Sequence, residues 1–296
     1  MTRANPSTPT NRIGLQSPVG RQLWLCVAVV AGFCIGSVAL WNRHSERVAD
    51  NDNFLLSAAE IRITQQPAWI HSDVRAESIA YGGLDEAIDI RDRRLTERVA
   101  TAFAAHPWIR QVHRVAKQYP AKVVVQVEYR EPVAMVEVIY DGARSLQPVD
   151  AEGIVLPTED FAASQVLKYP RVNVGLQMTS SDAGQKWGDA RVTEAAEIAS
   201  LLGAHWEELK LARIALSDPS DSAEPAFVLE TIAGDRIIWG SAPGRELPQE
   251  TLAAQKVAVI LDLATESAIT QNQPDSQLDL RTAGRNITAA TMSTRR

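Results

Sequence analysis

The feature that most constrains this chain is a long uncharged apolar run close to its N-terminus. Residues 22–42 contain no charged side chain, and 19 of them read LWLCVAVVAGFCIGSVALW. In a helix with a rise of about 1.5 Å per residue, this stretch spans roughly 28 Å, close to the ~30 Å thickness of the hydrocarbon layer of a bilayer. The run therefore predicts a transmembrane helix over residues 23–41.

The residues at the two ends of the run favour a membrane anchor. Trp24 and Trp41 lie where indole rings prefer the headgroup region, and Arg21 and Arg43 flank the run with charge. A buried core helix is one alternative, but such a helix normally has a polar stripe, which is missing here. A cleaved signal peptide is another, because residues 37–39 resemble a cleavage site. The long N-terminal tail and the length of the run favour an uncleaved anchor.

The distribution of arginines predicts the orientation of this helix. Three arginines and no acidic residue precede the run, whereas only Arg43 and Arg47 follow it closely. The positive-inside rule compares Lys and Arg on the two sides of the membrane. We therefore expect a cytoplasmic tail at residues 1–22 and a folded part outside the cytoplasm.

Charge and cysteine content exclude two classes of protein. The chain has a net charge of −6 and its first 42 residues carry +3, which leaves −9 for the rest. Such an acidic surface repels phosphate backbones, so we expect no nucleic acid as a partner. Cys26 and Cys34 both lie in the apolar run, so the outer part has no disulfide framework. Gly32 and Gly36 form a GxxxG spacing, which makes them the candidates for membrane helix packing.

The chain after the apolar run begins with a predicted linker over residues 42–56. Apolar and polar residues then alternate around Ile61 and Ile63, the pattern of a half-buried strand. Ser72 or Asp73 can cap a short helix that follows.

A second helix is predicted from about residue 92, because Leu95 and Val99 begin an apolar stripe at helical spacing. Strands are predicted at residues 112–115 and 123–130, where apolar and polar side chains alternate. The order strand, helix, helix, strand, strand makes residues 57–132 a small α+β unit with two helices on one face of a three-stranded sheet.

Residues 133–290 predict a mostly antiparallel β domain with flanking helices, followed by a disordered tail at residues 291–296. Strands are expected at residues 134–140, 146–149, 154–156, 209–216, 227–231, 236–239 and 277–281, and helices at about 191–202 and 248–265. The second of these helices is expected to have Leu252 on its apolar side. A short final strand near residues 286–289 would leave the sheet with an open edge.

Signatures of enzymes and metal sites are missing from the sequence. There is no GxSxG, P-loop, GxGxxG, HExxH or CxxC motif. Among the five histidines, the pair His106 and His113 has the nearest approach to a ligand spacing, but a proline and a predicted strand separate the two. The carboxylates are scattered and form no acid–base pair. We therefore predict no catalytic, cofactor-binding or metal-binding residue and no small-molecule substrate.

Short motifs recur along the outer part in a recognisable order. They lie at residues 106–109, 112–115, 119–120, 123–127 and 130–134, and then at residues 146–156, 229–240, Lys256 and 278–281. The first group resembles the polypeptide-transport-associated (POTRA) module of the bacterial cell-division proteins FtsQ/DivIB. The second group is similar to the β domain of the same family. Together with the single membrane helix, the resemblance covers about 230 of the 296 residues.

The resemblance implies a bitopic division protein without a catalytic site or cofactor. It would lie in the cell inner membrane and at the division septum, with its C-terminal domain in the periplasm. Its implied partners are membrane proteins of the FtsB and FtsL kind, and the POTRA module would meet further division proteins of the FtsW, FtsI and FtsK kind.

In the family, a strand of the partner adds to the edge formed by the last strands of the β domain. An open edge has unpaired N–H and C=O groups that favour such pairing. The matching residues of this sequence are Leu278, Asp279, Leu280, Arg281, Asn286, Ile287 and Thr288.

One departure from the family concerns this edge. The closing strand of the family often carries an aromatic side chain, whereas residues 282–290 contain none. Because aromatic residues are common hot spots of binding, we expect the identity or affinity of the partner to differ. Two other functions stay open: a different POTRA-bearing protein of envelope assembly or secretion, and a periplasmic enzyme without a recognisable motif.

Overall fold

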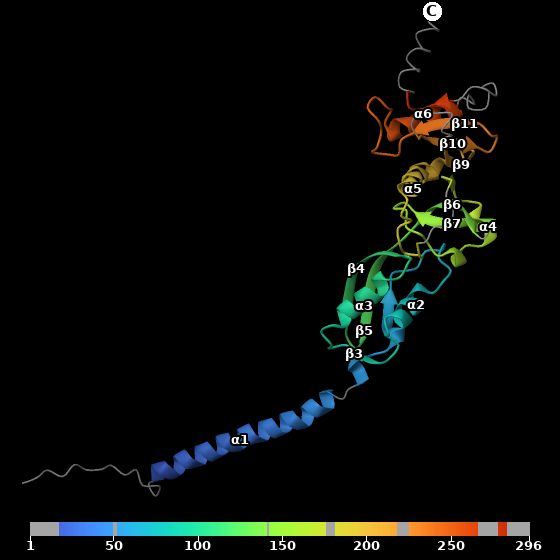
Figure 1. Cartoon of the computed structure of the whole chain (residues 1–296). Helices are drawn as coiled ribbons and strands as arrows, with labels where there is room; N and C mark the ends of the chain where they lie inside the picture. Colours follow the sequence, from blue (N-terminus) through green and yellow to red (C-terminus); the bar gives the residue numbers. More distant parts are fainter. Residues whose placement is uncertain are drawn as a thin grey trace, which may run out of the picture. The chain divides into compact units, whose positions relative to one another are not determined.

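The computed structural model describes residues 18–49, 52–140, 142–175, 181–217, 225–265 and 278–282. Two compact units divide the chain, residues 1–55 and residues 56–296. The protein is mixed α+β, with one apolar helix near the N-terminus and a body rich in sheet (Figure 1).

The first unit is dominated by the helix α1 (Pro18–Ala49). Within it, Trp24–Asn42 has a mean hydropathy of 2.2 and is long and apolar enough to cross a membrane, judged by length and composition. This confirms that residues 23–41 are helical and apolar. Helix α1 continues to Ala49, so the first part of the predicted linker at residues 42–56 is helical. No Gly or Pro interrupts residues 42–49, so the helix has no local reason to end earlier.

The second unit begins with what we call the first module, residues 57–131. Its elements are η2 (Ala58–Glu60), β2 (Ile61–Ile63), α2 (Val74–Tyr81), β3 (Ile88–Asp89), α3 (Leu95–Ala104), β4 (Ile109–Gln118) and β5 (Lys122–Tyr129), and η1 (Asp52–Phe54) and β1 (Leu55–Leu56) precede it. Strands β2, β5 and β4 form a three-stranded sheet in that order. Strand β2 pairs parallel with β5, and β4 pairs antiparallel with it. The predicted strands and helices are present, but the two-residue strand β3, which pairs with β1 in a separate sheet, lies between α2 and α3 and was not predicted.

The first module folds around an apolar layer between its helices and its sheet. The side chain of Asp73 caps α2 by accepting a hydrogen bond from Ala76 N at 2.9 Å. Val99 and Phe103 of α3 are fully buried, as is Val125 of β5. The helical stripe and the alternating strand seen in the sequence therefore meet in one core.

The second module, residues 132–282, is built on a seven-stranded sheet with the order β12-β11-β10-β9-β8-β6-β7. Its strands are β6 (Pro132–Tyr140), β7 (Ala143–Asp150), β8 (Arg171–Asn173), β9 (Leu211–Leu216), β10 (Phe227–Thr231), β11 (Arg236–Gly240) and β12 (Leu278–Asp279). Its helices are η3 (Thr158–Asp160), α4 (Ala163–Val166), α5 (Ala190–Leu202), η4 (Gly203–His205) and α6 (Ala253–Thr265).

The prediction of a mostly antiparallel sheet is confirmed only in part, because three of the six strand pairs described in this module are parallel. The pairs β6–β8, β8–β9 and β11–β12 are parallel, and the pairs β6–β7, β9–β10 and β10–β11 are antiparallel. Helix α5 lies between β8 and β9 in the chain, and α6 lies between β11 and β12. A helix between two neighbouring strands returns the chain to the same end of the sheet, so those strands run parallel.

Two strands and one helix boundary also differ from the predictions. The predicted strand at residues 154–156 is reduced to isolated bridges, Val149 with Val155 and Ile154 with Lys186. Strand β8, which splits the expected meander, was not predicted. Helix α6 begins at Ala253 rather than at residue 248, because Gln249 has a φ of 77°, which a right-handed helix excludes. Leu252 therefore precedes the helix and is 57% exposed, contrary to its predicted burial.

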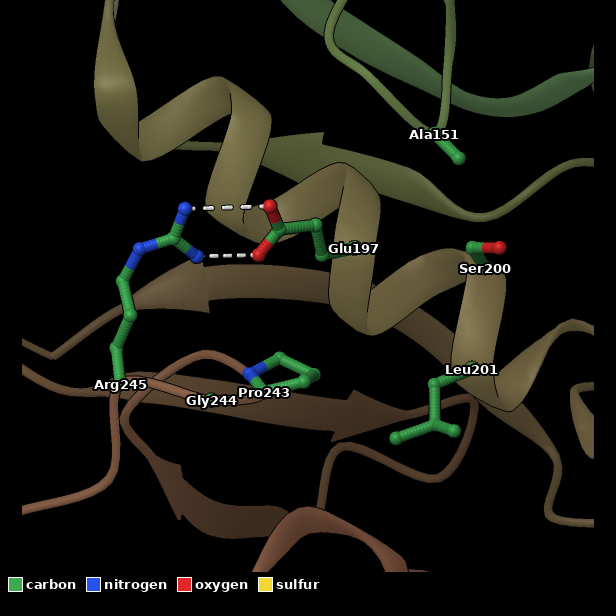
Figure 2. Close-up of a pocket in the computed structure, with 7 residues that line it drawn as sticks. All are labelled: Ala151, Glu197, Ser200, Leu201, Pro243, Gly244 and Arg245. Atoms are coloured by element: carbon green, nitrogen blue, oxygen red, sulfur yellow. Dashed lines mark hydrogen bonds and ion pairs between the residues drawn. The ribbon is translucent and has the colours of Figure 1, made fainter.

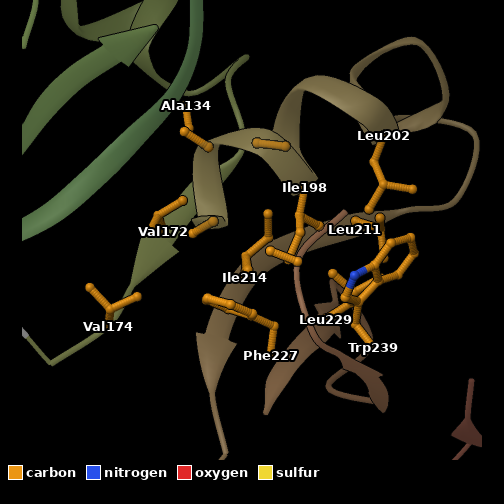
Figure 3. Close-up of a cluster of buried hydrophobic side chains, with 14 of the residues drawn as sticks. Ala134, Val172, Val174, Ile198, Leu202, Leu211, Ile214, Phe227, Leu229 and Trp239 are labelled. Carbon is orange, nitrogen blue, oxygen red and sulfur yellow. The ribbon is translucent and has the colours of Figure 1, made fainter. Parts of the chain in front are cut away.

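The core of the second module lies between the sheet and its helices. Ile198 and Leu202 of α5 point toward strand residues that include Ile214, Leu229 and Trp239 (Figure 3). All five are fully buried. This core fixes the sheet on which the candidate edge strand lies.

Candidate partner-binding edge

The predicted edge residues Leu278, Asp279, Leu280 and Arg281 lie at one end of the seven-stranded sheet. Strand β12 pairs parallel with β11, with Leu278 opposite Ile237 and Asp279 opposite Ile238. Among the described residues, no strand pairs with the other side of β12. The remaining predicted edge residues, Asn286, Ile287 and Thr288, lie outside the described residues.

The register decides which main-chain groups of this edge face outward. Leu280 N donates to Ile238 O at 2.9 Å, so the peptide groups of Leu278 and Leu280 point toward β11. Because successive residues of a strand alternate, the N–H and C=O groups of Asp279 and Arg281 point away from β11. Within residues 278–282, only these two residues can offer main-chain hydrogen bonds to an added strand.

The outward groups of Arg281 already have partners in the chain. Its carbonyl oxygen accepts hydrogen bonds from Thr251 N at 2.8 Å and from Thr251 Oγ1 at 3.0 Å. Its N–H donates to Asp279 Oδ1 at 2.9 Å. The main-chain N–H and C=O of Asp279 have no partner among the described residues. The open part of the described edge is therefore a single residue long.

The loop that carries Thr251 is held by a buried carboxylate. Glu250 accepts hydrogen bonds from Ser241 N, Ser241 Oγ and Leu247 N at 2.8 to 2.9 Å. It also pairs with Lys256 Nζ at 2.6 Å, and the side chains of Lys256 and Glu250 are 0% and 3% exposed. Burying a charge is costly unless it is paired, so this ion pair holds the loop and the start of α6 together.

Lys256 also contacts an aromatic ring of the neighbouring strand. Its Nζ lies 5.1 Å from the centroid of the Trp239 ring, a distance at which a cation is attracted to the ring face. The ammonium group of Lys256 therefore has two stabilising contacts, the carboxylate of Glu250 and the indole of Trp239 in β11.

A close packing of three residues adjoins the end of β12. Gly240 has a φ of 94°, which favours glycine. A Cβ at this position would lie 2.1 Å from Glu250 Oε1 and 2.7 Å from Arg281 Cγ. The end of β11, the loop and the end of β12 thus meet where only a glycine fits.

Hydrogen bonds at the edge favour the ionised forms of the Asp279 and Glu250 carboxyl groups. Burial raises the pKa of the Asp279 carboxyl, but the hydrogen bonds from Arg281 outweigh burial, and the net pKa lies below the ordinary value. For Glu250 burial likewise raises the pKa, and the hydrogen bonds from Lys256 and from main-chain N–H groups lower it below its ordinary value. Both carboxylates are therefore ionised at neutral pH.

A second set of polar contacts joins the two modules. Asp160, which is 5% exposed, accepts hydrogen bonds from His71 N, Ser72 N, Ser72 Oγ and Trp108 Nε1. All four donors belong to the first module, whereas Asp160 belongs to the second. Trp108 is fully buried. No local pattern in the sequence indicates this contact, because its partners lie up to 89 residues apart.

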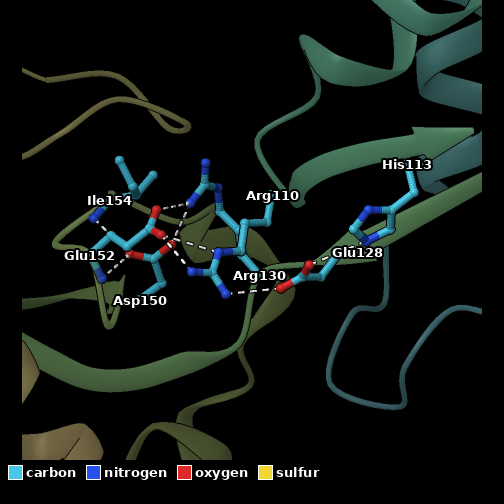
Figure 4. A network of polar contacts seen from close by, with 7 residues as sticks. All are labelled: Arg110, His113, Glu128, Arg130, Asp150, Glu152 and Ile154. Carbon is cyan, nitrogen blue, oxygen red and sulfur yellow. Dashed lines mark hydrogen bonds and ion pairs between the residues drawn. The ribbon is translucent and has the colours of Figure 1, made fainter.

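A cluster of ion pairs lies at the same junction (Figure 4). Arg130 Nη1 lies 2.6 Å from Asp150 Oδ2 and 3.2 Å from Glu152 Oε2. Arg110 pairs with Glu152 at 2.7 Å and with Glu128 at 2.9 Å. The side chains of Arg130 and Asp150 are 13% and 6% exposed, so this pair is largely shielded from solvent.

A hollow of about 530 Å³ lies elsewhere on the second module. Figure 2 shows that Glu197 of α5 and Arg245 form a bidentate pair at its side, with Pro243 and Leu201 nearby. The hydrogen bond with Glu197 raises the pKa of Arg245 above its ordinary value. Glu197 and Arg245, the two charged residues that line the hollow, thus pair with each other.

The other residues singled out in the sequence are not brought together. His106 Nε2 lies 3.1 Å from Glu77, and His113 Nε2 lies 3.3 Å from Glu128. No group of three or more His, Cys, Asp or Glu within the described ranges could hold a metal ion. Gly32 and Gly36 lie on α1, where a Cβ would meet nothing within 4 Å.

Sequence reasoning missed Thr251, Glu250 and Lys256 as parts of the edge. One signal was present: in α6 Lys256 stands between Ala253 and Ile260 on the helical stripe that is buried. A lysine on such a stripe requires a buried partner. Nothing in the sequence identified that partner or the contact of Thr251 with Arg281, 30 residues away.

Comparison with known proteins adds no relative to this picture. No model of a protein family matches the sequence, and no curated protein matches it.

Proposed function

We propose that this protein is a non-catalytic, single-pass scaffold of the bacterial division machinery, of the FtsQ/DivIB kind. The observation that carries the proposal is the edge strand β12, at which no other part of the described chain pairs with the main-chain groups of Asp279, in a protein with a helix able to cross a membrane. Open main-chain groups at a sheet edge are the means by which an extended segment of another protein is bound.

The order of elements supports the two modules of that family. The first module has two helices and a three-stranded sheet, which fits a POTRA module. The second module is a larger sheet with β12 at its end, which fits the family's β domain. In this proposal α1 anchors the protein in the inner membrane, with its N-terminus in the cytoplasm and both modules in the periplasm at the septum.

The proposed partners are single-pass membrane proteins of the FtsB and FtsL kind. Such a partner adds an extended segment to β12, and division proteins of the FtsW, FtsI and FtsK kind meet the first module. The scaffold then acts by holding these proteins together.

The test uses the full-length protein and two variants at one position. Asp279→Pro removes the outward N–H and leaves the bonds to β11 intact, since those come from Leu278 and Leu280. Asp279→Ala keeps the N–H and removes the same carboxylate. We expect a co-expressed FtsB-like protein to be captured by the alanine variant and not by the proline variant. Equal capture by both folded variants would contradict strand addition.

Cells provide the test of the division role. Depletion of the protein is expected to give filamentous or unseparated cells, and a fluorescent fusion is expected at midcell. An even distribution around the cell periphery with normal division would instead favour the alternative, a different POTRA-bearing protein of envelope assembly or secretion.

A further inference from the structure

We infer that the second module has a separate binding trough, which takes an extended basic segment of a partner protein. The trough consists of two adjoining hollows of about 530 Å³ and 250 Å³. Ala151, in the turn after β7, and Ser200 of α5 line both hollows, so the hollows meet at these two residues. The first hollow extends toward Pro243 and Arg245 (Figure 2), and the second extends to Glu131 at the junction of the modules. No residue of β12 lines either hollow.

The middle of the trough offers small side chains and open hydrogen-bonding groups. Ala151, Ser200 and Gly244 leave room for a main chain to pass over them. The N–H and C=O groups of Ala151 and the hydroxyl of Ser200 have no hydrogen-bond partner among the described residues, and Ser200 is exposed. An extended segment has a donor or an acceptor at every step of its main chain, so it can satisfy these groups.

The charge of the lining decides the kind of segment. Three arginines and five carboxylates line the two hollows, which leaves a net charge of −2 on the described lining. Each arginine pairs with a carboxylate of the same lining, namely Arg110 with Glu152, Arg130 with Asp150, and Arg245 with Glu197. The remaining carboxylates are Glu128, which shares Arg110, and Glu131, which is exposed and has no ion pair or hydrogen bond within the described part of the chain. The surplus negative charge therefore lies at the junction end of the trough and favours a Lys or Arg of the partner there.

The other end of the trough favours an apolar side chain. Leu201, which is 38% exposed, and Pro243 line it, and its charged residues are already paired with each other. Covering Leu201 removes apolar surface from water. The fitting ligand is therefore an extended segment with a Lys or Arg near Glu131 and an apolar residue near Pro243. The negative lining repels nucleic acids and anionic lipid headgroups, and a trough open to solvent encloses too little of a small molecule.

The trough is held in shape before any partner arrives. Gly153, at the end of the turn that carries Ala151, has a φ of 71°, and a Cβ there would lie 2.5 Å from Thr193 Oγ1 of α5. The turn thus packs directly on the helix that carries Ser200. Asp150 Oδ1 also accepts hydrogen bonds from Glu152 N and Ile154 N, both at 2.9 Å. A preformed site spends little of its binding energy on ordering its own loops.

Binding of synthetic peptides to the full-length protein in detergent tests the charge of the ligand. The probe is a fluorescently labelled peptide with lysines at one end, leucines at the other and Ser-Gly repeats between them, and its counterpart has glutamates in place of the lysines. Fluorescence anisotropy, corrected for empty micelles, is expected to show binding of the lysine peptide at least about ten-fold tighter. Equal affinities, or no binding of either peptide, would overturn the inference.

Charge reversals at two positions test whether Glu131 is the contact. Glu131→Lys is expected to weaken binding of the lysine peptide about three- to ten-fold. Glu207→Lys is the matched control, because it changes the net charge of the chain equally at an exposed residue that lines neither hollow, and it should bind like wild type. Equal weakening by both variants would show that the peptide responds only to the overall charge and would overturn the trough.

A substitution at the meeting point of the hollows tests the location. Ser200→Phe fills this point from an exposed position, and we expect at least about a ten-fold loss of affinity for the lysine peptide. Ser164→Phe, at an exposed serine of α4 that lines neither hollow, is the control. Full affinity of Ser200→Phe with an unchanged circular dichroism spectrum would overturn the trough. The peptide should also bind Asp279→Pro as it binds wild type, and a loss there would place it at β12 and overturn the trough, whereas the proposed function is tested separately by capture of the FtsB-like protein.

Discussion

Lys256 Nζ lies 2.6 Å from Glu250 Oε1, and both side chains of this ion pair are buried beside the edge strand of the second module. The pair connects α6 to the loop that contacts Arg281, so its integrity decides whether the edge keeps its form. We make four predictions, one for substitutions at this pair and three for other positions of the two modules.

The first prediction concerns the pair itself. Lys256→Met leaves the carboxylate of Glu250 buried without its cation, and we expect the free energy of unfolding in urea to fall by about 3–5 kcal/mol. The double variant Lys256→Met with Glu250→Gln removes both charges and should recover a large part of that loss. If the single and double variants were equally destabilised, the cost would come from packing rather than from the unpaired charge.

The second prediction concerns Gly240. Gly240→Ala places a methyl group 2.1 Å from Glu250 Oε1 in addition to the cost of a positive φ. Gly234→Ala is a matched control, because Gly234 has a φ of 95° and nothing within 4 Å of a Cβ. We expect a loss of about 1 kcal/mol for the control and of at least about 3 kcal/mol for Gly240→Ala, measured by urea denaturation. Similar losses at both positions would mean that the loop yields to the methyl group.

The third prediction concerns the junction of the two modules. In wild type, both carboxylate oxygens of Asp160 accept hydrogen bonds from the first module. Asp160→Asn replaces one of these oxygens by an NH₂ group, which cannot accept a hydrogen bond from the donors that face it. The indole N–H of Trp108 or the N–H of Ser72 then loses its acceptor, and we expect the free energy of unfolding to fall by about 2–4 kcal/mol. Ser72→Ala, which removes one donor and leaves the carboxylate, should cost about 1 kcal/mol. An asparagine variant as stable as the wild type would show that the junction does not depend on Asp160.

The fourth prediction concerns pH. The hydrogen bond from Arg110 lowers the pKa of Glu152 below its ordinary value of 4.5, with a further bond from Arg130 and against the effect of burial. Because the folded-state pKa lies below the unfolded one, this contribution to stability is fully present above pH 4.5. It is lost as the pH falls through the folded-state pKa.

The measurement compares the free energies of unfolding of wild type and Glu152→Gln between pH 7 and pH 3. The difference between the two curves is expected to shrink below about pH 4.5. Glu207→Gln, which removes one exposed charge away from the junction, serves as the control. A difference that stays constant with pH would show that the Arg110–Glu152 pair does not contribute through ionisation.

Local patterns predicted the elements of the fold better than their pairing. The stripe with Val99 and Phe103 predicted α3, and alternation around Val125 predicted β5, because each reports the burial of one face. The parallel pairs of the second module were missed although helices α5 and α6 were predicted between the strands concerned. A helix between neighbouring strands is itself the signal of parallel pairing.

The same limit applies to the candidate edge. A strand was predicted at residues 277–281 and the family resemblance assigned residues 278–281 to the partner-binding edge, but the outward direction of the Asp279 groups follows only from the register with Ile238. A proline at Leu280 would be a poor test of partner binding, because its N–H bonds to β11. Contacts such as Thr251 with Arg281 join distant parts of the chain, and no local pattern encodes them.

The contact of Asp160 with Trp108 bears on how the protein can be dissected. A fragment that ends at the boundary between the modules would retain an indole ring that is fully buried in the whole protein, but its N–H would have lost its acceptor. Such a fragment would expose a new surface around Ser72 and Trp108 and bind material that the intact chain never meets. Binding studies on the isolated N-terminal piece would therefore report on a surface created by the cut.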